Sequence, residues 1–383
     1  MRVVISGEIG VAGQQIIRRL NELGHAPSLV GSNPDWLGQL FPQLTALDYG
    51  SPAIADLGYD IWVHLIVPER EGGANLVEGA ERAARAAQKT DLAGAGRFIC
   101  LSSISTLSEN HSTEAQQMRL AEAALREIWA GDLEVVYVPA ITDRTGGSTL
   151  RSNLAKAFSP SVRANELVAA LISRQEGTYI STGARVVVDP QDANPVFRFA
   201  KRTIDLVLAI GILVCLWWAM IIVWAAVRLQ SPGPGIYRQP RVGRDGRTFT
   251  CLKFRTMVLS TPDKGTHEIS DTAVTRLGRI LRSTKLDELP QIFNVIRNEM
   301  TFVGPRPSLP SQFDIVTERE KRGILRVKPG ITGLSQIKHI DMSDAVRLAE
   351  CDYRYLALQS LKLDFQIMLA TLVGQGSGDR TQK

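Results

Sequence analysis

The sequence predicts an α/β protein in two parts: a doubly wound parallel sheet, then a membrane-inserted helix followed by a mostly helical region. In the first 185 residues, short apolar runs alternate with helical patterns, which is typical of a parallel sheet covered by helices. An uncharged apolar run over residues 206–227 is long enough to cross the hydrocarbon core of a bilayer. The total length of 383 residues suits two domains.

Composition excludes several classes of protein. Hydrophobic residues make up 44% and charged residues 22%, so the chain is neither disordered nor a polytopic membrane protein. The four cysteines, Cys100, Cys215, Cys251 and Cys351, stand far apart and form no CxxC pair. This pattern excludes a disulfide framework and a zinc ribbon, and it suits a reducing compartment.

The charge is unevenly distributed along the chain. Residues 1–190 carry 16 Lys and Arg against 21 Asp and Glu, whereas residues 191–383 carry 28 against 18. A basic back half favours an anionic partner such as phosphate groups, nucleic acid or a lipid surface.

The N-terminus predicts a nucleotide-binding turn. Residues 1–7 form a short apolar strand, Gly7, Gly10 and Gly13 follow it, and residues 14–23 have a helical pattern. Glycines at such a turn let the backbone approach a pyrophosphate and let the helix pack closely on the sheet. Further strands are predicted at residues 61–67, 97–103 and 134–138, with a helix at residues 113–128. Together these segments predict a Rossmann-like domain.

Three motifs make residues 1–185 resemble the extended short-chain dehydrogenase/epimerase family: the GxxGxxG turn, Val63-His64-Leu65 and Ser102-Ser103. The resemblance implies a site for NAD(P) or a nucleotide-sugar at Gly7, Gly10 and Gly13. Asp48 is a candidate for contact with an adenine edge, with a surface loop acid as the more common alternative. The family's catalytic Tyr and Lys are replaced by Ala115 and Arg119. We therefore expect a domain that binds or regulates without hydride chemistry, and whether it binds NAD(P) at all stays open.

The apolar run predicts a membrane helix over residues 203–229. Basic residues flank both of its ends, which favours a cytoplasmic location for both ends. The apolar part of the N-terminal strand is too short for a signal peptide, so we expect the front half in the cytoplasm too. A re-entrant helix satisfies both conditions; a spanning helix and a buried core helix are the alternatives. The expected location is the bacterial inner membrane, with both domains facing the cytoplasm.

The region after this helix is strongly basic. Arg276 and Arg279 lie one helical turn apart beside apolar residues, a pattern typical of a helix in a membrane interface. Because the basic block over residues 238–255 directly follows a membrane segment, we expect lipid headgroups or phosphorylated substrates as partners rather than nucleic acid.

The most informative pair is Asp287-Glu288. Pro290 suits the first turn of a helix, so the two carboxylates are predicted at its N-terminus, where the helix dipole stabilises negative charge. Adjacent carboxylates beside a basic surface suit a divalent cation that bridges to a pyrophosphate. Plain helix capping is the alternative.

Read together, residues 197–373 resemble the bacterial sugar transferase family, the monotopic phosphoglycosyl transferases. The matching stretches are KRTID (201–205), KFRTM (253–257), TRLGRILR (275–282), LDELPQ (286–291), FVGPRP (302–307) and KPGITGLSQ (328–336). Two departures stand out: Trp217-Trp218 replaces the usual Ser-Pro pair of the membrane helix, and Leu334-Ser335 replaces the usual Trp-Ala. Neither departure affects Asp287 or Glu288.

The resemblance implies a covalent mechanism. Asp287 would attack the β-phosphorus of a UDP-sugar, expel UMP and carry the phosphosugar until a polyprenyl phosphate accepts it. Asp287 and Glu288 would hold Mg²⁺. Arg255 and Arg306 are candidate phosphate clamps, with structural ion pairs as the alternative; the further candidates are Lys253, Arg276, Arg279 and Arg282, for which a headgroup-facing surface is the alternative.

The expected activity is the first step in the synthesis of a surface polysaccharide or glycoconjugate. The alternatives are a membrane-anchored NAD-dependent sugar-nucleotide epimerase or dehydratase, and a scaffold without catalysis. The predicted boundaries are 1–185 for the Rossmann-like domain, 186–202 for a linker, 203–229 for the membrane helix, 230–373 for the catalytic domain and 374–383 for a flexible tail. The sugar is not identified, and a homodimer stays open.

Overall fold

The computed structural model divides the chain into two compact units. The first comprises residues 1–148 and 160–189, and the second comprises residues 149–159 and 190–383. The structure describes residues 1–66, 76–90, 96–107, 112–129, 131, 133–142, 150–173, 179–181, 184–188, 190–258 and 273–374. Nearly all of the predicted tail, residues 375–383, lies outside the described residues.

The first unit alternates strands and helices as predicted. Its strands are β1 (Val3–Gly7), β2 (Ser28–Val30), β3 (Ala46–Leu47), β4 (Ile61–Leu65), β5 (Arg97–Ser103), β6 (Leu133–Val138), β7 (Ala140–Thr142), β8 (Ser161–Arg163), β9 (Tyr179–Ser181) and β10 (Ala184–Val186). Its helices are α1 (Val11–Glu22), α2 (Pro34–Leu40), α3 (Leu76–Thr90), α4 (Thr113–Ile128) and α6 (Ala164–Ile172).

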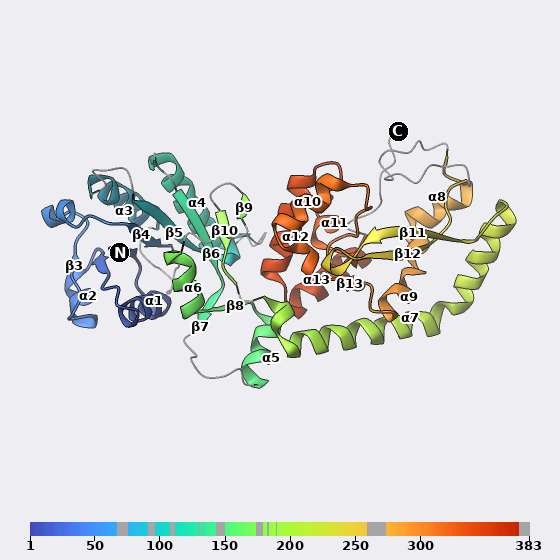
Figure 1. Cartoon of the computed structure of the whole chain (residues 1–383), viewed down its shortest axis with the longest axis horizontal. Coiled ribbons are helices and arrows are strands. Elements are labelled where there is room, and N and C mark those ends of the chain that lie inside the picture. The colour runs from blue at the N-terminus through green and yellow to red at the C-terminus, as the bar shows by residue number, and fades with distance from the viewer. Residues whose placement is uncertain are drawn as a thin grey trace. The chain divides into compact units, whose positions relative to one another are not determined.

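The strand order confirms the doubly wound sheet. The main sheet runs β3-β2-β1-β4-β5-β6-β10-β9, parallel except for the last pair, with helices on both faces (Figure 1). Both faces are therefore buried, which is why its strands are continuous apolar runs. The order reverses between β1 and β4, the position where open sheets of this kind bind ligands at the carboxyl ends of their strands.

The second unit is mostly helical, as predicted. Its helices are α5 (Leu150–Phe158), α7 (Pro195–Gln230), α8 (Arg276–Ser283), α9 (Gln291–Ile296), α10 (Phe313–Lys321), α11 (Leu334–Ile337), α12 (Ala345–Leu358) and α13 (Leu361–Leu372). Its strands form two pairs: antiparallel β11 (Ile236–Val242) with β12 (Thr248–Phe254), and parallel β13 (Thr301–Val303) with β14 (Gly330–Thr332).

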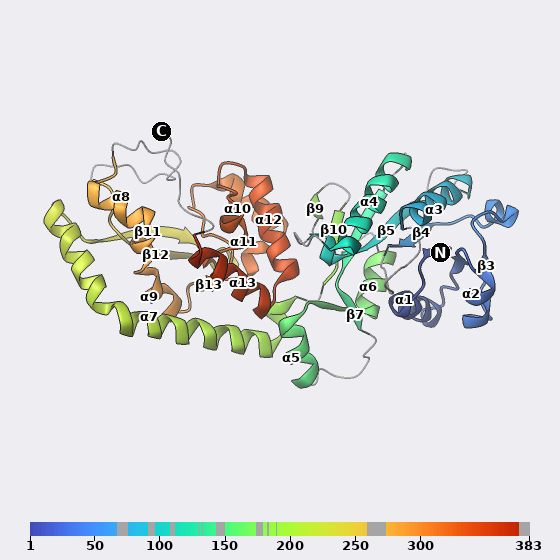
Figure 2. The ribbon, with the colours of Figure 1, turned by 180° about the vertical axis from the view of Figure 1, so that it is seen from behind.

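Helix α7 is longer than the predicted membrane helix. It begins eight residues earlier, at Pro195, because the Asn194 side chain caps it by accepting from the backbone N–H groups of Val196 and Phe197. The predicted linker is therefore partly helical. From its start α7 runs past the other elements of the second unit and bends towards its C-terminal end, as both views show (Figures 1 and 2).

One face of α7 packs on the second unit and the other does not. Ala209 lies in a core with Ile292 and Val295 of α9, and Met220 packs with Phe254 and Leu281 further along. The opposite face presents a stripe of exposed apolar side chains at helical spacing: Val207, Ile210, Val214, Trp217 and Ile221. Within the described residues, α7 alone is long and apolar enough to cross a membrane.

Candidate active site

Asp287 and Glu288 lie in a short 3₁₀ turn, Leu286–Glu288, immediately before α9. Lys285 precedes this turn in the left-handed conformation, with φ of 57°, and reverses the chain after α8. Pro290 follows as the N-cap of α9 and fixes the exit from the turn. The local sequence therefore places two adjacent carboxylates just before the N-terminus of α9, as predicted.

Glu288 faces cations from two other elements. Lys253 of β12 donates from Nζ to Glu288 Oε1 at 3.0 Å, and an Arg306 guanidinium nitrogen lies 3.9 Å from the same oxygen. All three side chains are mostly buried, at 18% exposure each. The fold thus unites three of the predicted residues from segments 35 and 18 positions apart along the chain.

Asp287 is buried, and burial raises its pKa to about 6, helped by repulsion from Glu288. Lys253, Arg282 and Arg306 act in the opposite direction without cancelling the effect. The N-terminus of a helix is expected to stabilise negative charge, but α9 has only six residues, and burial is the largest influence on the pKa of Asp287. No hydrogen bond to the Asp287 side chain occurs among the described residues, so its oxygens are available to an incoming group.

A buried chain of hydrogen bonds supports the loop that carries Arg306. Arg319 donates to the carbonyl oxygen of Arg306 at 2.7 Å and to Asp352 Oδ2 at 2.6 Å. The Ser335 hydroxyl donates to the other carboxylate oxygen of Asp352 at 3.0 Å. Ser335, one of the two departures from the family motif, therefore adds a hydrogen bond to this support.

Two glycines set the shape of the same loop. A side chain on Gly304 would lie 2.7 Å from the carbonyl oxygen of Lys328, and Gly330 faces Gly304 at equally close range. The N–H of Gly330 donates to the carbonyl oxygen of Pro305 at 2.9 Å. Only glycines permit this approach, which brings the FVGPRP and KPGITG segments together.

Arg255 has a different role from the one predicted. Its guanidinium is buried and donates to the carbonyl oxygens of Pro232 at 2.7 Å and Ser231 at 2.8 Å, and to the Ser231 hydroxyl. These contacts cap the C-terminal end of α7. These contacts favour a structural role for Arg255, because both terminal guanidinium nitrogens are already bonded at the helix end. Its buried Nε has no hydrogen-bond partner among the described residues.

The three arginines of α8 separate into two groups. Arg276 and Arg279 are exposed and lie three residues apart, on the same side of the helix. Arg282 turns inward, donates from Nε to the Thr256 hydroxyl at 3.0 Å, and lies close enough to Asp287 to lower its pKa. The site therefore gathers Asp287, Glu288, Lys253, Arg306 and Arg282.

Three residues near the carboxylates were missed by the sequence analysis. Lys285 lies beside Glu288, and burial lowers its pKa. Gln291 and Arg241 line the same small depression as Lys253, Glu288 and Arg306. Lys285 and Gln291 belong to the LDELPQ neighbourhood and could have been found there. Arg241, which donates to the carbonyl oxygen of Pro307 at 2.9 Å, belongs to the basic block over residues 238–255, but nothing in that block distinguished it from its neighbours.

The KRTID motif anchors the start of α7 to this unit. Lys201 binds Asp364 at 2.5 Å and the carbonyl oxygen of Val303 at 3.0 Å. Arg202 donates to the last carbonyls of α9, those of Val295 and Ile296. In addition, Asp205 accepts from the Thr301 hydroxyl and the Phe302 N–H. With Arg255 at the other end, both ends of α7 are fixed to the same unit.

In the first unit, the predicted nucleotide turn is in contact with a tyrosine. The Gly7 N–H donates to the Tyr49 hydroxyl at 3.0 Å, and burial raises the pKa of Tyr49 to about 12. Gly7 has φ of +102°, and any side chain there would collide with the carbonyl of Leu65. Gly10 is the N-cap of α1, and Gly13 is buried in it. The predicted turn is present, with its first amide already bonded.

The other predicted residues of this turn give little support for a dinucleotide. Asp48 is exposed and accepts from the N–H of Gly50 at 2.8 Å, which is a local turn contact. Ala115, at the position of the family's tyrosine, is fully buried. Arg119 donates to the carbonyl oxygen of Thr106 at 3.4 Å. The side chains needed for hydride transfer are therefore missing from these positions.

The carboxylate pair suits Mg²⁺ better than zinc. Within the described part of the chain, no group of three or more His, Cys, Asp and Glu side chains is arranged to hold a metal. Mg²⁺ differs from zinc because it commonly uses one or two carboxylates together with substrate phosphates and water. Burial, together with repulsion from Glu288, raises the pKa of Asp287, and a divalent cation would stabilise this carboxylate in its charged form.

Comparison with known proteins agrees with the geometry. The family model for bacterial sugar transferases matches residues 196–375. A UDP-glucose:undecaprenyl-phosphate glucose-1-phosphate transferase of Caulobacter vibrioides is 38% identical over 182 residues, covering 45% of this chain and 68% of that protein. The uncharacterized sugar transferase EpsL of Bacillus subtilis is 37% identical over 172 residues, covering 45% of this chain and 85% of that protein.

Longer relatives match over the same region. The undecaprenyl-phosphate galactose phosphotransferase of Salmonella typhimurium is 35% identical over 191 residues, which are 45% of this chain and 40% of that protein. The first unit has a distant structural likeness to the enzyme WbmG of Bordetella bronchiseptica in complex with NAD. It is 12% identical with a TM-score of 0.35, covering 49% of this chain and 72% of that one. The fold of the first unit rests on its strand order instead.

Proposed function

Because the chain belongs to the bacterial sugar transferase family, we propose that its second unit moves a sugar 1-phosphate from a UDP-sugar to undecaprenyl phosphate and releases UMP. By its name, the Caulobacter vibrioides relative acts on UDP-glucose and undecaprenyl phosphate. The name of the Salmonella typhimurium relative gives undecaprenyl phosphate and galactose. The family relationship supports the transferase over the membrane-anchored epimerase, and the buried Ala115 agrees with it. The reaction would begin the synthesis of an exopolysaccharide, O-antigen, capsule or other glycoconjugate.

The observation that carries the proposal is the environment of Asp287. Its carboxylate makes no hydrogen bond to the described protein, and Lys253, Arg282 and Arg306 surround it closely enough to affect its pKa. A structural carboxylate in such surroundings would be paired with one of these cations. An unpaired carboxylate beside cations that match phosphate oxygens is instead the arrangement expected of a nucleophile.

The proposed reaction has two displacements at the same phosphorus. A carboxylate oxygen of Asp287 attacks the β-phosphorus of the UDP-sugar, the bond from that phosphorus to the bridging oxygen breaks, and UMP leaves with the electron pair. An oxygen of undecaprenyl phosphate then attacks the phosphorus, the bond to Asp287 breaks, and the carboxylate is restored. Lys253 and Arg306 would balance the negative charge that gathers on the phosphate oxygens.

Glu288 and Asp287 are the residues that would hold Mg²⁺. When bound, the cation supplies charge neutralisation for the pyrophosphate. Lys253 keeps Glu288 in place through its 3.0 Å hydrogen bond, and the Ser335, Asp352 and Arg319 chain holds the loop that carries Arg306. The second unit therefore orients the phosphate-binding groups before substrate arrives.

For the membrane, we propose that α7 enters one leaflet and returns, with both units in the cytoplasm. Two contacts support this topology. The start of α7 is bound through Lys201 to Asp364, and its end is bound through Ser231 to Arg255, so both ends belong to one folded unit. A spanning helix would require part of that unit on each side of the bilayer. The exposed apolar stripe of α7 would face the lipid tails.

The test is release of UMP by the purified full-length protein, given undecaprenyl phosphate, Mg²⁺ and a panel of UDP-sugars. The proposal expects UMP together with a lipid-linked diphosphosugar, and a phosphosugar on Asp287 when the lipid acceptor is withheld. Release of UDP in place of UMP would mean that the sugar moves without its phosphate, and would contradict the covalent mechanism. The responding UDP-sugar would identify the substrate.

A further inference from the structure

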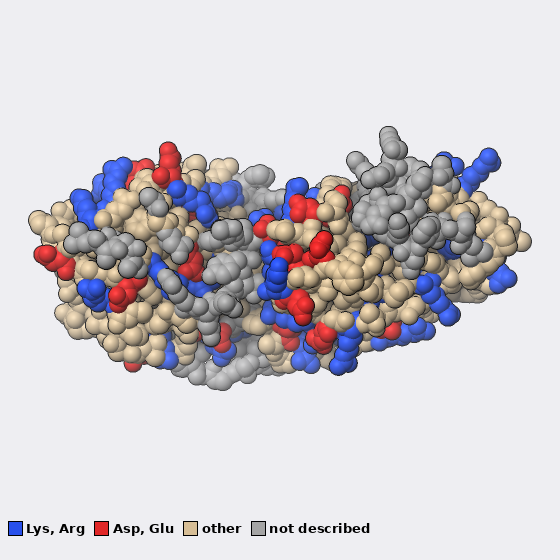
Figure 3. All heavy atoms as spheres, turned by 45° about the horizontal axis from the view of Figure 1, so that its top comes forward, with Lys and Arg blue, Asp and Glu red and all other residues tan. Residues whose placement is uncertain are grey.

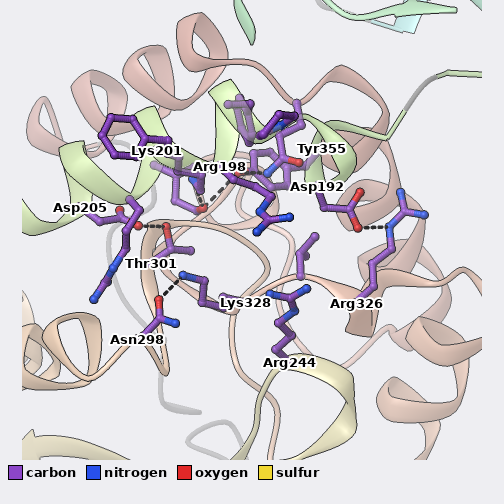
Figure 4. Close-up of a pocket in the computed structure, with 17 residues that line it drawn as sticks. Asp192, Arg198, Lys201, Asp205, Arg244, Asn298, Thr301, Arg326, Lys328 and Tyr355 are labelled. Atoms are coloured by element: carbon purple, nitrogen blue, oxygen red, sulfur yellow. Dashed lines mark hydrogen bonds and ion pairs between the residues drawn. The ribbon is translucent and has the colours of Figure 1, made fainter. Parts of the chain in front are cut away.

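The second unit contains a separate basic pocket of about 410 Å³ at the N-terminal end of α7 (Figure 4). None of its lining residues lines the depression formed by Lys253, Glu288 and Arg306. Its volume falls in the range of small-molecule sites. Its charged lining side chains are Arg198, Lys201, Arg202, Arg244, Arg326, Lys328, Asp192 and Asp205.

Three of these groups are committed to the fold. Lys201 is bound to Asp364, Arg202 to the C-terminal carbonyls of α9, and Asp205 to Thr301 and Phe302. These contacts are satisfied without any ligand, and they fix the wall of the pocket.

The remaining cations are poorly balanced. Asp192 lies 3.6 Å from Arg326 and is the only other carboxylate among the lining residues that the structure describes. Asp245, which does not line the pocket, lies 3.6 Å from Nε of Arg244 at an exposed position, so it balances Arg244 only weakly. In Figure 4 the guanidinium groups of Arg198 and Arg244 point towards each other across the pocket. Nothing in the described part of the chain accepts a hydrogen bond from the Arg198 guanidinium. Like charges that converge in this way repel each other unless an anion lies between them.

Lys328 adds to the positive charge at the base of the pocket. Its ammonium donates to Asn298 Oδ1, a neutral acceptor, at 2.6 Å. Burial, with repulsion from Arg202, Lys201 and Arg244, lowers the pKa of Lys328 to about 8 although Asp205 acts against this. A concave surface with excess positive charge concentrates anions, and guanidinium forks match phosphate oxygens.

We propose that this pocket binds a ligand that carries at least two phosphate groups. Arg198 and Arg244 contact one phosphate between them, and Lys328 and Arg326 contact the other. The surroundings allow two sources for this chemistry. Phe199, which also lines the pocket, is 75% exposed at the polar end of the membrane helix, so a diphosphorylated lipid headgroup can reach the site. A soluble diphosphate can reach it equally well. The pocket lies outside the proposed catalytic site, and ligand binding in the pocket does not depend on the proposed transferase activity.

The experiment measures binding to the full-length protein in nanodiscs, with Arg306→Gln in every sample to weaken phosphate binding at the catalytic site. The pocket variant is Arg198→Gln with Arg244→Gln. The matched control is Arg238→Gln with Arg247→Gln, which removes the same charge from exposed positions that do not line the pocket. Inorganic pyrophosphate is added to phosphatidylcholine nanodiscs, and separately cardiolipin, which has two phosphates, is included in the nanodiscs. Isothermal titration calorimetry measures the affinity for pyrophosphate. The thermal midpoint of unfolding measures the effect of both pyrophosphate and cardiolipin.

At least one probe is expected to bind the control protein and raise its thermal midpoint, with binding to the pocket variant weaker by tenfold or more. Binding of pyrophosphate identifies a soluble source, and an effect of cardiolipin alone identifies a lipid source. Equal binding to the pocket variant and the control would overturn the proposal, as would the absence of an effect from both probes. Arg198→Gln alone, at an exposed position, replaces the double variant if that variant does not fold.

Discussion

Each unit contains a buried carboxyl group whose pKa is raised by burial, yet the two groups have opposite meanings. In the first unit, Glu122 accepts from the Ser102 hydroxyl at 2.5 Å and from the Tyr137 hydroxyl at 2.8 Å, so both of its oxygens are satisfied. In the second, Asp287 has no such partner among the described residues and lies among cations. A raised pKa therefore marks a reactive group only where the structure leaves its oxygens available.

The largest expected difference comes from neutralising these two carboxyl groups. Asp287→Asn should lower UMP release by at least about 1,000-fold, because an amide cannot act as the nucleophile. Glu122→Gln should leave the rate of turnover within about twofold of the wild type, because Glu122 only connects α4 to β5 and β6 in the first unit. Initial rates of UMP release at saturating UDP-sugar compare the two variants.

Unfolding of Asp287→Asn serves as the control for that comparison. At pH 7.5 the folded wild type must keep a charged carboxylate buried, whereas the Asn side chain is neutral. The variant should therefore be at least as stable as the wild type. Turnover by a folded Asp287→Asn variant at more than a tenth of the wild-type rate would contradict the nucleophile assignment.

Arg306 and Arg255 allow a residue proposed to bind phosphate to be compared with one that supports the fold. Arg306→Gln should lower kcat/KM for the UDP-sugar by about 10- to 100-fold, the loss of one charge-assisted phosphate contact. Arg255→Gln should instead reduce the free energy of unfolding by about 1–3 kcal/mol, because it leaves the end of α7 uncapped. Steady-state kinetics and thermal unfolding are measured for both proteins. A large rise in KM with unchanged stability for Arg255→Gln would return Arg255 to the list of phosphate ligands.

Acid should affect the contributions of His64 and Asp287 to stability in opposite directions. His64 is fully buried against Ser6, and burial lowers its pKa to about 3. Below pH 6.5 His64 therefore binds a proton in the unfolded chain but not in the folded unit, and the free energy of unfolding falls as the pH drops from 6.5 towards 3. Between pH 7.5 and 4.5 this costs the first unit about 2.5 kcal/mol. Asp287, whose pKa is raised to about 6, contributes the opposite slope below pH 6.

Hydrogen exchange of the β4 peptide, corrected for intrinsic rates, measures the His64 effect at the two pH values. The His64→Gln variant has no proton to gain and should lose most of this pH dependence. Equal acid sensitivity in the variant and the wild type would assign the effect to other groups.

The smallest effect is expected from removing residues 1–190. Transfer activity should stay within about fivefold, since the proposed catalytic residues all lie in the second unit. The thermal midpoint should fall modestly, because α5 belongs to the second unit and Gln191 donates to the carbonyl oxygen of Lys156 at 2.6 Å. A folded truncated protein without any activity, measured as UMP release, would show that the first unit takes part in catalysis.

Local pattern was enough to predict the central strands of the first unit and several of the helices. The strand at Arg97–Ser103 and the helix at Thr113–Ile128 have the predicted bounds, because buried strands and amphipathic helices follow short-range periodicity. The start of α7 was missed, since the prediction followed the apolar run, whereas the cap, Asn194, lies before the charged residues that precede this run. Asp287 and Glu288 were predicted because the LDELPQ motif is contiguous in the sequence.

The sequence by itself therefore determined the two-part architecture, the apolar helix and the carboxylate pair. Only the tertiary structure decided where each cation lies. Arg255 and Lys253 are separated by one residue on β12 and its end, yet one caps α7 and the other binds Glu288. The basic pocket unites Arg198, Arg244 and Lys328 from distant segments. A long, flexible side chain carries little information about its partner, because the partner is set by long-range packing rather than by neighbours along the chain.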